Sequence, residues 1–167
     1  MYSKLVELIQ DHSEELSQRV LKDMLSRKET ESYNKLHRKE VYRRIYEVYS
    51  RLESWLSKDT PRDDLMEHYT RLGRRRFTEG IPLKEVVMAL LLIKRYLWLY
   101  ILETYLFKST FEIYQSLEMN NRVVLFFDRA IYFSSMGYEE AREKAREEET
   151  ELARDMDAKS GEKLVEA

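Results

Sequence analysis

Cysteine is absent from this sequence, and glycine and proline are scarce, with four and two copies in 167 residues. Without cysteine the chain forms no disulfide, carries no thiolate nucleophile and binds no metal through sulfur. A chain of this kind suits a reducing compartment, so we expect a cytoplasmic protein. Sheets and hairpins depend on turns rich in glycine and proline, and their scarcity therefore predicts an all-α protein with few connections.

Signatures of catalysis and of nucleic-acid binding are also missing. The formal net charge is -2, so no overall positive field would attract nucleic acid. The four glycines are scattered and form no phosphate-binding loop. His12, His37 and His68 lack the spacing of metal-ligand motifs, although His68 is retained as a candidate haem ligand. We therefore expect no enzymatic activity, no bound metal and no cofactor.

Apolar side chains recur at steps of three and four residues along most of the chain, as on one face of a helix. Residues 27–32 form a polar break between the first two helices. Gly80 and Pro82 stand in the order typical of a corner between helices. Asn120 and Asn121 are candidates for an interruption of a later helix. We therefore expect a bundle of about five to six helices, the last of which is a C-terminal connector. The pattern places the helices before the connector at about residues 5–24, 41–55, 60–79, 82–108 and 111–136.

The segment of residues 86–102 is apolar at almost every position, with Lys94 and Arg95 in its middle. A cation at the centre of a bilayer costs roughly 2.5–3.5 kcal/mol on insertion scales, and the flanking apolar pieces are shorter than the about 20 residues of a span. A helix that is apolar on most sides must be covered on most sides. We therefore expect no membrane span, a central helix, and a homodimer interface that uses aromatic residues such as Tyr96 and Tyr100.

Arg74, Arg75 and Arg76 are consecutive, and consecutive helical residues point about 100° apart, so the three cannot form one patch. Helical phase places Arg76 on the inward face of its helix. A buried guanidinium must be paired, and two kinds of partner remain open. One is an acidic side chain such as Glu79. The other is the head of an anionic ligand, for which Arg76 would be the main polar contact, with weaker contacts from Tyr69, Phe77 and Trp98.

After Gly137 the sequence loses nearly all its large apolar residues. Its many Glu–Arg and Glu–Lys pairs, three or four residues apart, add only about 0.2–0.5 kcal/mol each to a helix. We therefore divide the chain into a sensor domain at 1–137 and a charged connector with a frayed end at 138–167. The connector either projects alone or pairs with its counterpart in a dimer along a weak seam of Tyr138, Ala141, Ala145, Leu152 and Met156.

Two stretches carry a family resemblance: HYTRLGRRRFTEGIPLKEVVMALLLIKRYLW and, at a distance, VVLFFDRAIYFSSMGYEEAR. They resemble the N-terminal sensory domain of RsbR- and RsbRD-type co-antagonists of the bacterial stressosome, which is also similar to the input module of some bacterial histidine kinases. The shared features are the arginine-rich helix end, the Gly-Ile-Pro-Leu corner before a long apolar helix, and a late Phe-Asp-Arg-Ala helix. They cover roughly residues 65–142, whereas the first sixty residues fit by helical pattern only.

The resemblance implies a globin-like helical bundle without haem, a signalling role, and dimerisation through the late helices. In the family the last helix leads into an output domain, whereas this chain ends at Ala167. It is therefore expected to be an excised input domain or a free-standing sensor or adaptor. Dimerisation through the late helices adds three residues to the expected interface: Phe127, Ile131 and Tyr138.

The leading hypothesis is a bacterial signal-sensing input domain that acts as a homodimer. It would sense a small anionic or apolar ligand and relay the signal through its last helix to an output or partner signalling protein. Two alternatives stay open. One is a helical adaptor that binds proteins without a small ligand, and the other is a haem or lipid carrier.

Overall fold

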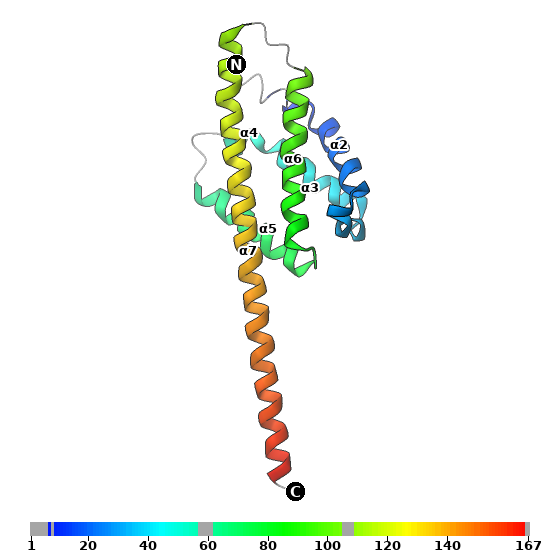
Figure 1. Cartoon of the computed structure of the whole chain (residues 1–167), viewed down its shortest axis with the longest axis vertical. Coiled ribbons are helices and arrows are strands. Elements are labelled where there is room, and N and C mark those ends of the chain that lie inside the picture. The colour runs from blue at the N-terminus through cyan, green and yellow to red at the C-terminus, as the bar shows by residue number, and fades with distance from the viewer. Residues whose placement is uncertain (1–6, 8, 57–61, 105–108, 166–167) are drawn as a thin grey trace.

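The computed structural model describes residues 7, 9–56, 62–104 and 109–165 of the chain (Figure 1). Every regular element within these ranges is a helix, which confirms the all-α prediction. In chain order the elements are α2 (Ser13–Ser26), the 3₁₀ helix η1 (Lys28–Lys35), α3 (Arg38–Ser50), α4 (Leu52–Leu56), α5 (Arg62–Thr78), α6 (Leu83–Thr104) and α7 (Thr110–Val165).

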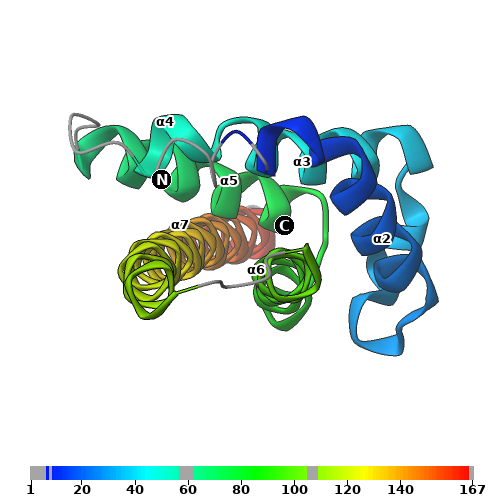
Figure 2. The ribbon, with the colours of Figure 1, turned by 90° about the horizontal axis from the view of Figure 1, so that it is seen from above.

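Helix α7 forms the long axis of the molecule, and its C-terminal part extends well beyond the other helices (Figure 1). Helix α6 runs beside the N-terminal part of α7 in the opposite direction. Seen along the long axis, α6 and α7 form one layer, with α3, α4 and α5 above it and α2 at the side of α6 (Figure 2). Helix α5 crosses α7 in the most extensive contact between any two described elements.

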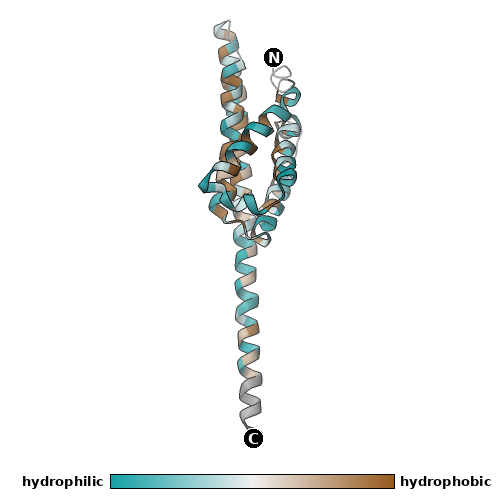
Figure 3. Ribbon diagram, turned by 90° about the vertical axis from the view of Figure 1, so that its right-hand side faces the viewer, coloured by the Kyte–Doolittle hydropathy of each residue, from teal (hydrophilic) through white to brown (hydrophobic). Residues whose placement is uncertain are grey.

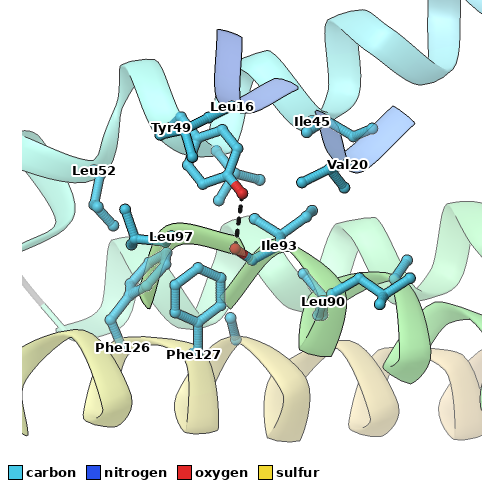
Figure 4. Close-up of a cluster of buried hydrophobic side chains, with 14 of the residues drawn as sticks. Leu16, Val20, Ile45, Tyr49, Leu52, Leu90, Ile93, Leu97, Phe126 and Phe127 are labelled. Carbon is cyan, nitrogen blue, oxygen red and sulfur yellow. Dashed lines mark hydrogen bonds between the residues drawn. The ribbon is translucent and has the colours of Figure 1, made fainter. Parts of the chain in front are cut away.

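The core lies between these two layers. Tyr49, Leu97 and Phe127 come from α3, α6 and α7, and all three are completely buried. The Tyr49 hydroxyl donates a 2.7 Å hydrogen bond to the backbone carbonyl of Ile93, so the buried phenol is satisfied (Figure 4). This bond fastens α3 to α6. Because α6 buries side chains along most of its length, it is the central helix that the sequence predicted.

The corner between α5 and α6 has the predicted form. Gly80 has a φ of 70°, a conformation that a residue with a Cβ adopts only under strain. The amide of Gly80 donates to the carbonyl of Phe77, and the amide of Ile81 donates to that of Arg76. These two bonds satisfy carbonyls at the C-terminus of α5 and reverse the chain direction into α6.

The predicted polar break after the first helix is instead structured as η1. The backbone amide and the hydroxyl of Ser32 both donate to the carboxylate of Glu85 in α6, at 2.8 and 3.0 Å. Both residues are buried. The Thr30 hydroxyl donates to the carbonyl of Met24 at 2.7 Å. The helix does break after Ser26, as predicted, but the sequence did not predict η1, because apolar periodicity cannot reveal a segment that polar contacts hold to the core.

Two predicted helix boundaries also differ from the structure. The second predicted helix divides at Arg51 into α3 and α4. Asn120 and Asn121 do not interrupt α7, because the preference of asparagine against helix is weak and the packing of neighbours such as Met119 and Val123 outweighs it. The predicted end of the fourth helix, at 105–108, lies outside the described residues.

Helix α7 continues without a break beyond the body of the domain. It stays helical through Gly137 to Val165, so the fraying predicted for the last eight residues is not seen as far as Val165. From Arg142 to Ala158 nearly every side chain is exposed, and the segment is predominantly hydrophilic (Figure 3). The helix therefore passes without interruption from the body of the domain, where Tyr138 and Glu140 still contact α5, into an exposed segment from Arg142. The division of the chain at 137 stays a prediction.

Candidate functional site

The guanidinium of Arg76 points into the domain, as predicted, and the residue is 6% exposed. Its Nη1 lies 3.1 Å from a carboxylate oxygen of Glu79, one turn further along the chain. The phenol of Tyr33 also lies near Arg76, whose positive charge opposes the rise in the pKa of Tyr33 that burial causes. Burial lowers the pKa of Arg76, as does the charge of Arg44, whereas the charge of Glu79 and its hydrogen bond to Arg76 oppose that shift. The sequence left two kinds of partner open for Arg76, and in the structure Arg76 pairs with an acidic side chain.

Glu79 belongs to a wider ion cluster that joins the α5–α6 corner to α3. Arg44 donates to both carboxylate oxygens of Glu79, at 2.9 and 2.7 Å, and also to Glu40 at 2.7 Å. Burial alone would raise the pKa of Glu79, but the hydrogen bond from Arg44 and the charge of Arg76 lower it. Hydrogen bonds from Arg43 and Arg44 lower the pKa of Glu40 to about 2. The cluster pairs its charges within the protein.

The other end of the arginine run contacts α7. Arg74 donates to a carboxylate oxygen of Glu140 at 2.7 Å, and the ring of Phe77 packs edge to face on that of Tyr138, with centroids 5.4 Å apart. Arg75 is exposed to solvent. The C-terminal turns of α5 therefore contact α7 at the point where α7 leaves the body of the domain.

Two glycines allow α5 and α7 to touch through their backbones. A Cβ on Gly73 would lie 1.9 Å from the carbonyl oxygen of Ser134, and a Cβ on Gly137 would lie 2.0 Å from that of Thr70. Neither position therefore accepts a side chain without movement of a helix. Within the described residues, the hydroxyls of Thr70 and Ser134 are buried at this crossing without a hydrogen-bond partner. The close packing of α5 against α7 therefore leaves two buried hydroxyl groups without a hydrogen bond.

A groove of about 490 Å³ lies between α6 and α7, and none of its lining residues belongs to the ion cluster. Its walls are mainly apolar and include Trp98, Met119 and Val123. Lys94 and Arg95, the two cations within the apolar helix, also line it. The groove falls within the range of about 300–1,000 Å³ that is typical of small-molecule sites.

The four residues predicted to contact a ligand do not come together. Arg76 lies in the ion cluster, Tyr69 is buried among aromatic rings, and Phe77 packs on Tyr138. Of the four, Trp98 alone lines the groove. The ligand role of this set stays a prediction, and helical phase could not reveal that its members face different parts of the fold.

His68, the candidate haem ligand, lies between aromatic side chains. Its ring centroid is 5.2 Å from that of Trp55 and 5.0 Å from that of Tyr69. Burial lowers the pKa of His68, so the neutral imidazole is favoured. In the described part of the chain, no group of three or more His, Cys, Asp or Glu side chains is arranged to hold a metal ion. Nor does any helix of the described ranges have the length and apolar character to cross a membrane.

The five residues predicted for a dimer interface all pack within their own chain. Tyr100 and Phe127 are buried, and Ile131 is partly buried against the core. Tyr96 donates a 3.0 Å hydrogen bond from its hydroxyl to Asp23, and Tyr138 packs on α5 as described above. The role of these five residues in a dimer interface stays a prediction, because one helix pattern cannot separate contacts within the core from contacts with a second chain.

A different set of apolar side chains is exposed on α6 and α7. We call these exposed side chains the outer face, in which Tyr132 is 64% and Leu125 is 49% exposed. Soluble monomers rarely expose many neighbouring apolar groups, and such patches typically mark interaction sites. The outer face comprises Leu91, Leu99, Leu102, Tyr114, Leu117, Leu125 and Tyr132.

Comparison with known families decides the class of the protein. Residues 14–153 match the model of the RsbT co-antagonist protein rsbRD N-terminal domain. The chain belongs to this family. The match spans the globin-like helical body and the first part of the projecting helix, and it confirms the resemblance drawn from the sequence. No curated protein and no solved structure matches the chain.

Membership of the rsbRD N-terminal family assigns the protein to regulatory sensory domains of the stressosome type. The matched segment includes both sides of the α5–α7 crossing, the ion cluster and the groove between α6 and α7. Each of these features therefore lies within the family domain.

Proposed function

We propose that this protein is a homodimeric input domain that receives a signal in its helical body and passes it on through α7. The observation that carries the proposal is the continuity of α7, which is packed against α5 and α6 and then projects as the same helix. A displacement of α5 or α6 in the body would move α7 and, with it, the projecting segment.

The outer face is the surface that we assign to the dimer. Its exposed apolar side chains extend along both α6 and α7, so a second copy would cover them in an antiparallel or parallel bundle of four helices. A parallel pairing would also bring the two projecting segments side by side. There Leu152 and Met156 are 62% and 63% exposed and would contact their counterparts along the weak seam.

The contacts between α5 and the start of the projecting segment provide the route for the signal. Arg74 binds Glu140, Phe77 packs on Tyr138, and Gly137 touches the backbone of α5. A ligand or partner that favours one position of α5 within the body would carry α7 with it and so shift the population of α7 positions. The recipient is an output or partner signalling protein in the cytoplasm.

A helical adaptor without a small ligand is the second candidate. The observation in its favour is that Arg76, the predicted ligand contact, has protein partners in Glu79 and Tyr33. In this case the signal would be carried by a protein that binds the projecting segment or the outer face.

Sedimentation of the purified chain tests the dimer. We expect a dimer for the wild type and a monomer for the double variant Leu125→Glu, Tyr132→Glu, which places two charges in the outer face. Gln18→Glu adds a negative charge at an exposed position of α2 and serves as the control. A double variant that keeps its helical circular dichroism and remains dimeric would contradict the assigned surface.

A further inference from the structure

The groove between α6 and α7 combines apolar walls with unbalanced charge, and one of its residues, Leu91, also belongs to the outer face. Its walls are apolar, with Leu91, Trp98 and Ile101 from α6 and Met119 and Val123 from α7. A soluble domain gains free energy when such surface is removed from water, at about 25 cal/mol per Å². The groove therefore favours a ligand with a substantial hydrocarbon part.

The charges at the groove are unbalanced. Lys94 and Arg95 both line it, and they interrupt a helix that is otherwise apolar from residue 86 to 102. The Lys94 ammonium pairs with Asp128 of α7 at 3.1 Å. Asp23 of α2 is close enough to Arg95 to be affected by its charge, but its hydrogen bonds come from Arg27 and Tyr96. One cation is thus neutralised by Asp128, and the guanidinium of Arg95 provides a net positive charge beside the apolar walls.

Two further polar side chains of α7, Ser116 and Asn120, line the groove, and the Ser116 hydroxyl donates to the backbone carbonyl of Glu112 at 2.8 Å. The amide of Asn120 can donate hydrogen bonds to a ligand, and a guanidinium can bind both oxygens of a carboxylate at once. The aliphatic stem of Lys94 can cover hydrocarbon while its ammonium stays in water. The side chains present match a ligand that has an apolar chain and one anionic head.

We propose that this groove binds a single-chain anionic amphiphile, an aliphatic carboxylate, with its chain against Trp98, Met119 and Val123 and its head near Arg95. The volume of about 490 Å³ suits one such chain and excludes a two-chain lipid as a fully enclosed ligand. The inference deepens the proposed function, because the ligand would be the sensed signal: it touches α6 and α7 together and so favours one arrangement of the two helices.

Isothermal titration of the full chain with dodecanoate below its micellar concentration tests the proposal. We expect saturable binding with a stoichiometry of one per chain. Dodecyltrimethylammonium, which has the same chain and the opposite charge, should bind at least about tenfold more weakly, because the charge-assisted hydrogen bonds to the head are lost. Equal affinity for the two amphiphiles, or no saturable binding of dodecanoate, would overturn the proposal.

Variants locate the site. Arg95→Gln should weaken dodecanoate binding at least about tenfold and strengthen binding of dodecyltrimethylammonium, because a repulsive charge is removed. Val124→Trp should abolish binding of both by filling the groove. Arg75→Gln removes an exposed cation from α5 and should change neither affinity. Unchanged dodecanoate binding by both Arg95→Gln and a folded Val124→Trp would overturn the assignment. If the Leu125→Glu, Tyr132→Glu monomer still binds dodecanoate, the ligand site stands independently of dimerisation.

Discussion

Gly73 of α5 and Gly137 of α7 contact each other's helix reciprocally, each with its Cα against a backbone carbonyl of the other helix. Two helices normally approach to 8–10 Å between axes, and glycine at the contact permits the closest approach. The crossing lies immediately before the segment of α7 that leaves the body. Close backbone contact at this point means that α7 cannot move there independently of α5.

Alanine at either glycine should destabilise the fold although alanine favours helix by roughly 1 kcal/mol. The added methyl group would overlap a backbone carbonyl, and overpacking of this kind costs about 1–3 kcal/mol or more. Chemical denaturation of Gly73→Ala and Gly137→Ala measures the loss of unfolding free energy. Arg75→Ala, at an exposed position of α5, should change stability little. Wild-type stability of both glycine variants would show that the crossing is looser than described.

The ion cluster makes a second prediction about stability. Glu79→Gln leaves the buried guanidinium of Arg76 without its charged partner, and breaking such a pair costs about 3–5 kcal/mol. The matched control is Glu67→Gln, which breaks a pair between Glu67 and Arg71 that is exposed on both sides. That change should cost no more than about 1 kcal/mol. Urea denaturation compares the two variants, and equal losses would mean that burial does not strengthen the Arg76 pair.

Loss of the Tyr49 hydroxyl should have a smaller effect. Tyr49→Phe removes the hydrogen bond to Ile93 but leaves an apolar ring of the same shape in the core. Because no buried donor remains unpaired, the expected loss is about 0.5–1.5 kcal/mol. Thermal and urea unfolding measure it. A loss well above this range would indicate that the phenol also orients its neighbours in α3 and α6.

Acid should unfold the protein in part through Glu40. Its pKa in the folded protein is about 2, below the usual 4.5, so the folded state favours the ionised carboxylate. The stability that this provides is present above pH 4.5 and is lost as the pH falls from about 4.5 towards 2. Glu40→Gln should therefore lose less unfolding free energy than the wild type between pH 6 and pH 3. Parallel losses in the two proteins would contradict a role for Glu40.

The helical fold was predictable because its determinants are local. Glycine scarcity, apolar periodicity and the Gly80 corner indicated the helices and the central place of α6. The structure of η1 was not predictable in this way, since it depends on Ser32 and Glu85, which are 53 residues apart. The contact of Gly73 with Gly137 likewise joins positions whose proximity no helix pattern reveals.

The candidate site was predictable only in part. Helical phase correctly predicted that Arg76 faces inward, and Lys94 and Arg95 stood out as the two charged residues of an otherwise apolar helix. It could not show that Glu79 pairs with Arg76 or that Lys94 and Arg95 line a groove with α7. Apolar residues on both sides of α7, such as buried Phe127 and exposed Leu125, could have indicated the outer face. Which side of α7 is covered, however, depends on the packing of all the helices.

Pulsed dipolar spectroscopy on spin labels tests the central claim, a dimer whose α7 helices run side by side. The chain has no cysteine, so Glu151→Cys introduces a single label on the projecting segment, and Lys22→Cys on α2 is the matched control. Packed helices lie about 8–10 Å apart, so the labels at position 151 should give a short, narrow intermolecular distance, well below that at position 22. A sample that sediments as a dimer but gives no short distance at position 151 would contradict the relay through paired α7 helices.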